Sequence, residues 1–547
     1  MPVEPPATVW LPGTPVSPGL ARGPLVHLAE SVEKTGAGAR EHGGAEAEAA
    51  SLRSALDASR AELDALMART GDTDAEAILA FQVAMLEDPV VTAPAFEAIS
   101  GNMAAALAWR AAMDAQIREF HEAEDLYFRA RASDLRDVRD RVLRHIAGDA
   151  ATRIPPDAIV VATDLPPSRF LEVQWNGGGI ALIDGSPNSH VAMLARSRGV
   201  PMMTGIGSID PGGHRDAILD AENGVLVLSP DAQALADVAA RQRAAASARA
   251  AEARYLNAPA ITAQGEPVQV MINVADIREL ESLDPRCCDG IGLVRTELLL
   301  RGEGDLDNEQ QQYELYERIL RWANPKPVTI RTLDAGGDKP IPGYTVDAER
   351  NPFLGVRGVR LSLIHPRVLN VQLRALARAA ALGPLKIMIP MVTRPHELEH
   401  VRLMLNAAVA DLRSKGVPGA APELGIMVEV PATALTIDLF DADFFSIGSN
   451  DLIQYVTASS RDASPLAALQ DPLQPAVLRL IHEVVERANA QRIAVSLCGD
   501  MASDPRCIPA LLGVGLRCLS VAPAAVGRVK AAIARYRKSE TDGGKAA

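Results

Sequence analysis

The sequence predicts an α/β multidomain protein, with a small α/β domain, a helical bundle inserted into it and a C-terminal (β/α)8 barrel. Three observations support this fold class. Residues 25–147 show helical periodicity, residues 148–230 contain short apolar runs between turn residues, and from residue 260 onward strand-like and helix-like runs alternate. A length of 547 residues suits about three domains.

The helical region, residues 25–147, has apolar side chains that recur on one face of a helix. Two stripes are formed by Leu52, Leu56, Leu63 and Met67, and by Leu135, Val138, Val142 and Ile146. Further helices are expected near 73–87 and 102–121, with Glu-Asp-Pro at 87–89 and Gly-Asn at 101–102 as breakers. The pattern predicts a bundle of about four helices.

The small α/β domain is predicted from three apolar runs, AIVVATDL, GGIALIDG and GVLVLSP, with a helix at HVAMLARSRG. A first strand is expected from the N-terminal segment PVSPGLARGPLVHL. The domain would then comprise residues 1–24 and 148–230, with the bundle inserted between them. Residues 231–258 are rich in alanine and predict a linker helix.

The barrel is expected over residues 259–540, before a polar, disordered tail at 541–547. Its eight strands are VQVMINV, IGLVRT, PVTIRTL, LKIMIPMV, LGIMVEV, FFSIGS, IAVSLCG and LRCLSVA. In a (β/α)8 barrel, active-site side chains come from the C-terminal ends of many strands.

Five predicted strands end in a charged or reactive residue. These residues are Arg295, Arg331, Glu429, Asp451 and Cys498. Two arginines, two carboxylates and a thiol at one mouth indicate an anionic substrate held on a metal ion. Neighbouring strands lie about 5 Å apart, so Glu429 and Asp451 could share one cation, and oxygen ligands favour Mg²⁺ or Mn²⁺ over zinc. The alternative is that each carboxylate pairs with a nearby arginine.

Four features, among them the strand-end thiol of Cys498, are candidates for chemistry. Arg461 follows GSNDLIQY, and the LDAGGDK segment carries Lys339 beside two glycines that allow close backbone approach or only a turn. Cys498 is either an acid, base or nucleophile, or a small buried hydrophobe. His190 follows a strand and a short loop at a helix start, where amides could receive a phosphate; the alternative is a capping or surface histidine.

Composition excludes several classes of protein. A net charge of −14 argues against a general nucleic-acid binder. No run approaches the roughly 20 apolar residues of a membrane span, and the N-terminus lacks the pattern of a signal peptide. Five unevenly spaced cysteines do not form a disulfide framework. We expect a cytoplasmic protein with reduced thiols, no nucleic-acid partner and no membrane insertion.

Long motifs then identify a resemblance. The segments SPNSHVAMLAR, IGLVRTE, RTLDAGGDK, NPFLGVRGVR, MVEVPA, GSNDLIQY and LCGD occur in an order that resembles the Enzyme I family of the bacterial phosphotransferase system, among the phosphoenolpyruvate (PEP)-utilising enzymes. The resemblance extends from about residue 12 to about residue 538. It implies a swivelling phosphohistidine domain, an insert that docks the small carrier protein HPr, and a PEP-binding TIM barrel that forms a homodimer.

The resemblance also implies roles for individual residues. His190 would carry the phosphoryl group, and Cys498 would protonate C3 of the enolpyruvate. PEP would be bound by Arg295, Arg331, Asn450, Asp451 and Arg461. Glu429 and Asp451 would hold Mg²⁺. Together they imply transfer of phosphoryl from PEP to His190 and then to a carrier, the first step of sugar uptake by this system.

The sequence departs from the family pattern at Ser186, Val191, Ser460 and Asp500, and it ends soon after the eighth strand and its helix. In the family the barrel domain forms the dimer and many relatives continue for another two helices, so the resemblance leaves the strength of a dimer open. Only about a dozen residues precede the first motif. The nitrogen-regulatory version in this family usually has an extra N-terminal sensory domain, so the resemblance favours the sugar branch or a carrier supplied separately. Two alternatives stay open: an ATP-dependent relative such as pyruvate phosphate dikinase or PEP synthase, and a non-catalytic regulator that senses phosphorylation.

Overall fold

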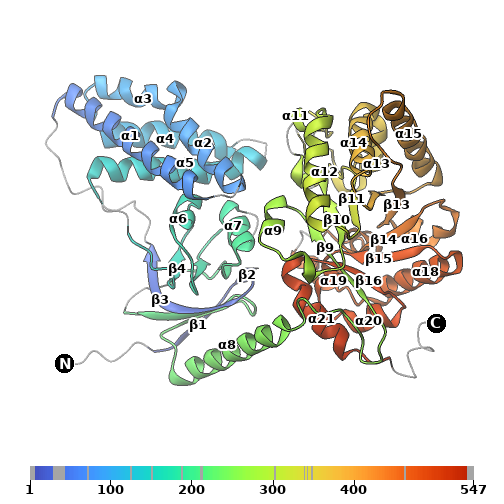
Figure 1. Cartoon of the computed structure of the whole chain (residues 1–547). Helices are drawn as coiled ribbons and strands as arrows, with labels where there is room; N and C mark the ends of the chain where they lie inside the picture. Colours follow the sequence, from blue (N-terminus) through green and yellow to red (C-terminus); the bar gives the residue numbers. More distant parts are fainter. Residues whose placement is uncertain are drawn as a thin grey trace. The chain divides into compact units, whose positions relative to one another are not determined.

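A computed structural model of the chain divides into two compact units, Met1–Ala245 and Ala246–Ala547 (Figure 1). It describes residues 7–28, 43–70, 73–122, 126–149, 152–185, 189–209, 213–300, 303–337, 339–341, 343–346, 349–460 and 464–538. The expected tail at 541–547 lies outside these residues.

The first unit contains an eight-stranded sheet with the order β1-β8-β7-β3-β4-β5-β6-β2. The strands are β1 (Val9–Pro12), β2 (Thr14–Ser17), β3 (Leu20–Leu28), β4 (Ile159–Ala162), β5 (Gly179–Leu182), β6 (Met202–Thr204), β7 (Asp216–Asp220) and β8 (Val225–Leu228). Strand β3 runs parallel to β4, with Leu25 opposite Ile159, so the N-terminal segment does belong to this sheet. The predicted boundary at residue 24 was wrong, because pairing with β4 continues to Leu28.

The inserted bundle has five helices in its described part, where about four were expected. They are α1 (Ala45–Thr70), α2 (Thr73–Glu87), α3 (Pro89–Ser100), α4 (Ala105–Glu122) and α5 (Leu126–Ala147). The extra helix, α3, begins at the predicted breaker. The Asp88 carboxylate accepts a hydrogen bond of 2.8 Å from the amide of Val90, and Pro89 occupies the first helical position.

The bundle and the sheet share one hydrophobic core. Leu52 and Trp109 of the bundle pack in the same buried cluster as Val160 and Ile180 of the sheet. Helices α6 (Pro167–Glu172) and α7 (His190–Arg198) lie between the two layers (Figure 1). Because the core is continuous, the bundle holds the loops and helix ends of the α/β part in place.

The predicted linker helix is α8 (Ala232–Ala253). Ala234 and Val238 near its start pack against Ile218 and Val227 of the sheet. Residues 241–250 are all exposed. This part of α8 is therefore a solvated helix without a buried stripe.

The second unit is a closed barrel in which all neighbouring strands are parallel, which confirms the eight predicted strands. They are β9 (Gln269–Val274), β10 (Ile291–Arg295), β11 (Val328–Arg331), β12 (Leu385–Ile389), β13 (Glu423–Val428), β14 (Phe444–Gly448), β15 (Ala494–Cys498) and β16 (Cys518–Val521). The connecting helices are α9 (Ile277–Glu281), α10 (Thr296–Leu299), α11 (Glu303–Leu306), α12 (Glu309–Ala323), α13 (Val359–Ile364), α14 (Pro366–Ala379), α15 (Pro395–Ser414), α16 (Pro431–Leu435), α17 (Ser449–Thr457), α18 (Pro475–Gln491), α19 (Asp500–Ser503), α20 (Ile508–Gly513) and α21 (Val526–Arg535).

Alternation along the strands divides the barrel side chains between two clusters. Ile426 and Val428 of β13 belong to the large cluster that also contains residues of α14 and α18, whereas Met427 belongs to a smaller one with Leu293 and Cys498. Successive side chains of a strand point to opposite faces. Glu429, two positions after Met427, is therefore expected on the inner face.

Among the described residues, no single helix is long and apolar enough to cross a membrane. The segments Ile78–Glu87 and Pro89–Ser100 meet a length-and-composition test only as a pair bent by 42°.

Candidate active site

The C-terminal ends of the barrel strands carry the residues that the sequence pointed to. Arg295 and Arg331 are the last residues of the paired strands β10 and β11 and lie opposite each other in their register. Cys498 ends β15, Glu429 directly follows β13, and Asp451 lies in the first turn of α17 after β14. Because all eight strands are parallel, these ends share one mouth of the barrel.

Arg331 is the buried centre of a charged network. Its Nη2 donates to Oε1 of Glu297 over 2.6 Å, and its Nη1 lies 3.2 Å from Oδ2 of Asp334. Lys339 Nζ adds a second cation, 3.0 Å from the same Glu297 oxygen. Both carboxylates are buried, so the two cations stabilise charges that would otherwise be costly in this site.

Arg357 was not singled out from the sequence, although it lies within NPFLGVRGVR. It is fully buried, with Nη2 2.8 Å from Oδ2 of Asp334 and Nη1 3.1 Å from Oδ1 of Asp451. Gly336 has a φ of +108°, and a Cβ there would stand 2.8 Å from the Cβ of Arg357. The glycines around Arg357 were the available signal, since such close backbone approach requires them.

Glu429 and Asp451 differ in their partners. Asp451 pairs with Arg357, as the alternative interpretation proposed, whereas Glu429 accepts 2.7 Å from the amide of Met391 and forms no ion pair within the described part of the chain. Burial, and then the nearby charges of Asp451 and Asp334, raise the pKa of Glu429 to about 8. Two carboxylates that repel each other in a buried site would be stabilised by an added cation.

The carboxylates of the barrel mouth limit which metal ion could bind there. The described residues contain no group of three or more His, Cys, Asp or Glu side chains arranged to hold one. Mg²⁺ is usually held by one or two carboxylates together with waters and substrate phosphates. Glu429 and Asp451 therefore fit Mg²⁺ or Mn²⁺, and they do not fit a zinc ion with four protein ligands.

Cys498 lies inside the barrel, packed among Leu293, Met388 and Met427. Its Sγ donates to the carbonyl of Ile447 over 3.5 Å and lies 3.8 Å from Oγ of Ser446. Burial raises the pKa of the thiol, although the hydrogen bond from Ser446 and the charges of Arg331 and Arg295 oppose that effect. The sulfur is therefore protonated at neutral pH and suited to donate a proton.

Two other predicted residues lie near the same mouth. Arg295 is half-buried and forms no hydrogen bond or ion pair with any residue that the structure describes, so its guanidinium is free to bind an anion. Asn450 is held by Asp500, whose amide donates to its Oδ1 over 2.9 Å and whose carboxylate accepts from its Nδ2 over 3.1 Å. Asp500 is one of the residues at which the sequence differs from the family pattern. Its two hydrogen bonds to Asn450 connect the start of α17 to the segment that directly follows β15.

Arg461 and Ser186 lie outside the described residues. Of the remaining departures, Val191 is buried in the core of the first unit, and the carbonyl of Ser460 accepts a hydrogen bond from Nε2 of Gln470. Neither the burial of Val191 nor the hydrogen bond of Ser460 adds a charged group to the barrel mouth.

His190 belongs to the first unit, not to the barrel unit. It is the first residue of α7, after Ser189, whose Oγ accepts 3.3 Å from the amide of Ala192 as an N-cap. The imidazole side chain is 14% exposed, and its Nδ1 lies 3.4 Å from the carboxylate of Asp134 in α5. The predicted placement at a helix start is confirmed. The contact with Asp134 was missed, because the segment was interpreted only as a helical stripe.

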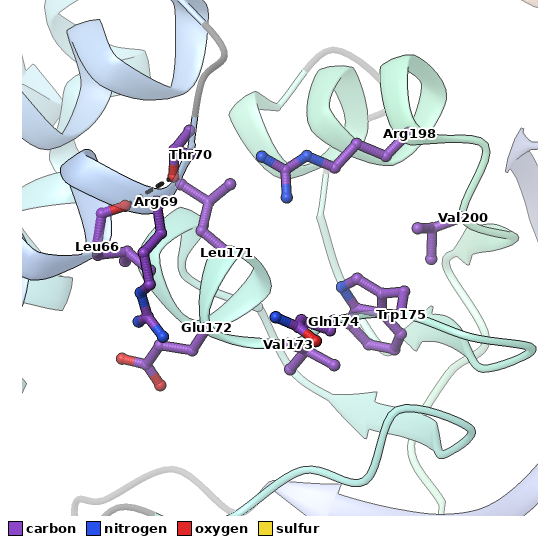
Figure 2. A pocket seen from close by; sticks show the side chains of 10 residues that line it. All are labelled: Leu66, Arg69, Thr70, Leu171, Glu172, Val173, Gln174, Trp175, Arg198 and Val200. Carbon is purple, nitrogen blue, oxygen red and sulfur yellow. Dashed lines mark hydrogen bonds between the residues drawn. The ribbon is translucent and has the colours of Figure 1, made fainter.

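Two cavities, one in each unit, are lined by described residues. One, of about 260 Å³, lies between the end of α1 and helices α6 and α7 (Figure 2). It is lined by Leu66, Arg69, Thr70, Leu171, Glu172, Val173, Gln174, Trp175, Arg198 and Val200. The other, of about 240 Å³, lies among the loops that follow β11 and includes Gly336 and Gly337. Glu429, Asp451 and Cys498 line neither cavity.

Known proteins match the chain over nearly its whole length. The PEP-binding domain of PEP-utilising enzymes matches residues 249–538, the N-terminal domain of these enzymes matches 12–131 and their mobile domain matches 154–224. The phosphoenolpyruvate-protein phosphotransferase of Staphylococcus carnosus is 33% identical over 509 residues, which cover 90% of this chain and 89% of that protein. That of Haloferax volcanii is 37% identical over 482 residues, covering 85% and 83%. The multiphosphoryl transfer protein of Rhodobacter capsulatus is 36% identical over 464 residues, covering 83% of this chain and 55% of that protein.

Proposed function

Because the chain belongs to the PEP-utilising enzymes, we propose that it transfers phosphoryl from PEP to its own His190 and then to a histidine of a small HPr-like carrier. Pyruvate is the second product. The observation that carries the proposal is the barrel mouth, where an unpaired arginine, a buried carboxylate and a protonated thiol lie at the ends of different strands. The name of the relatives supports the same reaction.

The two anionic groups of PEP explain the arginines. Arg295 and Arg331 end neighbouring strands, and a guanidinium group can bind carboxylate or phosphate through parallel hydrogen bonds. Arg461 and the amide of Asn450 are proposed to bind the same substrate, as the resemblance implies. Held in this way, the phosphorus faces the arriving imidazole in line with the leaving oxygen.

The proposed chemical step exchanges one bond to phosphorus for another. The lone pair of a His190 ring nitrogen forms the N–P bond while the P–O bond to the enolate breaks. The electrons of the enolate then take a proton at C3 from the thiol of Cys498, which gives pyruvate and a thiolate that solvent reprotonates. His190 must then leave the barrel mouth to meet the carrier, so α8 is proposed to allow the first unit to move.

Replacing Cys498 with alanine is expected to slow pyruvate formation by ~10²–10⁴-fold, the usual contribution of a general acid. PEP affinity should change little, since the thiol does not pair with an anion. Pyruvate release with a carrier present, measured by a coupled lactate dehydrogenase assay, checks this. Cys518→Ala, which removes the thiol from the opposite end of the neighbouring strand β16, is the matched control. Wild-type turnover in Cys498→Ala would exclude the thiol as the acid.

Removing divalent cations with EDTA is expected to reduce phosphorylation of His190 by at least ~100-fold, and Mg²⁺ or Mn²⁺ should restore it. When bound by Glu429 and Asp451, the ion supplies positive charge for the transferring phosphoryl group. Glu429→Gln should raise the Mg²⁺ concentration needed for half-maximal rate. Glu423→Gln, at the opposite end of β13 where Glu423 pairs with Lys386, should not. An unchanged Mg²⁺ requirement in Glu429→Gln would contradict this site.

The reaction is tested by incubating the full chain with ³²P-labelled PEP and Mg²⁺, then adding purified candidate carriers. Label on the chain, its passage to a carrier and equimolar pyruvate are expected. Labelling from ATP in place of PEP would instead identify a dikinase or synthase relative. Absence of both labels with every carrier would favour a non-catalytic regulator. The carrier that accepts label also decides between the sugar and nitrogen-regulatory branches.

A further inference from the structure

We propose that Asp134, on helix α5 of the inserted bundle, is a positioning residue that holds Nδ1–H of His190 and leaves Nε2 to accept the phosphoryl group. The proposal rests on the proposed function, since it assigns a role within that transfer. It gives the helical insert a part in the chemistry of the histidine as well as in carrier docking.

The contact involves a buried carboxylate and a nearly buried ring. Nδ1 of His190 lies 3.4 Å from both Oδ1 and Oδ2 of Asp134, whose side chain has no solvent exposure. An ionised carboxylate only accepts hydrogen bonds, so the nitrogen that faces it must carry the proton. In the neutral ring the other nitrogen, Nε2, then holds the lone pair that attacks phosphorus.

Both partners are fixed by their own helices. Asp134 is paired with Arg131 one turn earlier in α5, where Nη1 lies 3.1 Å from Oδ2. Its neighbour Leu135 is buried in the shared core. On the other side, the Ser189 cap and the buried Val191 hold the first turn of α7. The contact therefore joins two packed elements, and its geometry does not depend on a loose side chain.

The carboxylate also has a use during transfer. When the lone pair of Nε2 forms the bond to phosphorus and the enolate leaves, the ring keeps its Nδ1 proton and becomes positively charged. Asp134 offsets that charge for as long as Nε2 carries the phosphoryl group. When the group passes to the carrier, the electrons of the N–P bond return to Nε2 and the ring becomes neutral again with its proton still on Nδ1. At 3.4 Å the contact is longer than a strong hydrogen bond, so it can shorten as the ring becomes charged.

The experiment combines spectroscopy with kinetics on the full chain. Uniform ¹⁵N-histidine labelling and long-range ¹H–¹⁵N correlation spectra report which nitrogen of His190 carries the proton. In the wild type the proton is expected on Nδ1. In Asp134→Asn the amide can donate to Nδ1, so the ring should shift toward the Nε2–H form. The rate of labelling by ³²P-PEP should fall by between ~10²- and 10⁴-fold, as when a histidine is held in the wrong tautomer.

Two further variants separate positioning from folding. Asp134→Glu keeps the carboxylate and should recover the Nδ1–H form and at least part of the rate, even if Asp134→Asn fails to fold. Asp140→Asn removes a carboxylate from the same helix, where Asp140 pairs with Arg139, and should leave both readouts unchanged. A wild type that takes no label would refute the proposed function and leave the tautomer spectra to decide the role of Asp134. A labelled wild type with an Nε2–H ring, or Asp134→Asn at the wild-type rate, would overturn the inference.

Discussion

Replacing His190 with alanine is expected to abolish labelling of the chain by ³²P-PEP, a loss of at least ~10³-fold in rate. No other side chain of the proposed mechanism can carry the phosphoryl group between the two partners. PEP should still bind with little change in affinity, because the barrel has its own core and carries the arginines proposed to bind PEP. Labelling gels and a PEP-binding titration measure the two effects.

His214→Ala is the control for this prediction. His214 lies in the same unit, where its Nδ1 is 2.8 Å from Oγ of Ser229, and it has no part in the proposed transfer. It should label at the wild-type rate. Label that persists in His190→Ala, or that disappears in both variants, would show that the phosphoryl acceptor has been wrongly identified.

Replacing Arg357 with methionine is expected to destabilise the barrel by about 3–5 kcal/mol and to stop PEP turnover. The substitution leaves Asp451 buried without its cation and removes one of the cations around Asp334. Arg331, which also pairs with Asp334, would have to satisfy that carboxylate and could no longer keep its present geometry. Urea unfolding followed by the fluorescence of Trp322, the one tryptophan of the barrel unit, measures the stability.

Arg367→Met provides the comparison. Arg367 pairs with Asp307 at the surface, where such a pair contributes only about 0–1 kcal/mol. Equal effects of the two substitutions would contradict a central role for the buried network.

The network also gives the barrel a pH dependence with a definite sign. Burial favours the neutral form of Asp334, but Arg331, Arg357 and Lys339 outweigh burial and hold its pKa below the usual value. A carboxylate whose pKa is depressed by folding contributes stability that is complete above its unfolded pKa of about 3.9 and is lost as the pH falls below it. The difference in stability between wild type and Arg357→Met should therefore be full at neutral pH and shrink in acid.

Periodicity predicted the barrel because each strand is a short apolar run that ends in a polar residue. The same logic located Arg295, Arg331, Glu429, Asp451 and Cys498, since strand ends in a parallel barrel meet by geometry. The helix α3 was missed because proline was interpreted as a breaker, whereas Asp88 and Pro89 together begin a helix.

The roles proposed for Arg357 and Asp134 could not be predicted from the pattern of residue types along the sequence. Arg357 lies in a loop, and its partners Asp334 and Asp451 follow strands that are not neighbours in the sequence. Asp134 looks like one of many charges on a polar helix until folding buries it against α7. In both cases the role depends on burial and on a partner tens of residues away, and neither is visible from residue type and spacing alone.

The exposed stretch of α8, residues 241–250, also has a kinetic consequence. In the proposed transfer, α8 joins His190 covalently to the unit that would bind PEP, so the imidazole would meet bound PEP at an effective molarity set by this tether, whatever the dilution of the protein. Phosphorylation of His190 by bound PEP would then be first order, whereas transfer to a separate carrier would be second order. The concentration of the carrier would therefore determine the rate of transfer from phosphorylated His190, without changing the rate at which bound PEP phosphorylates each chain.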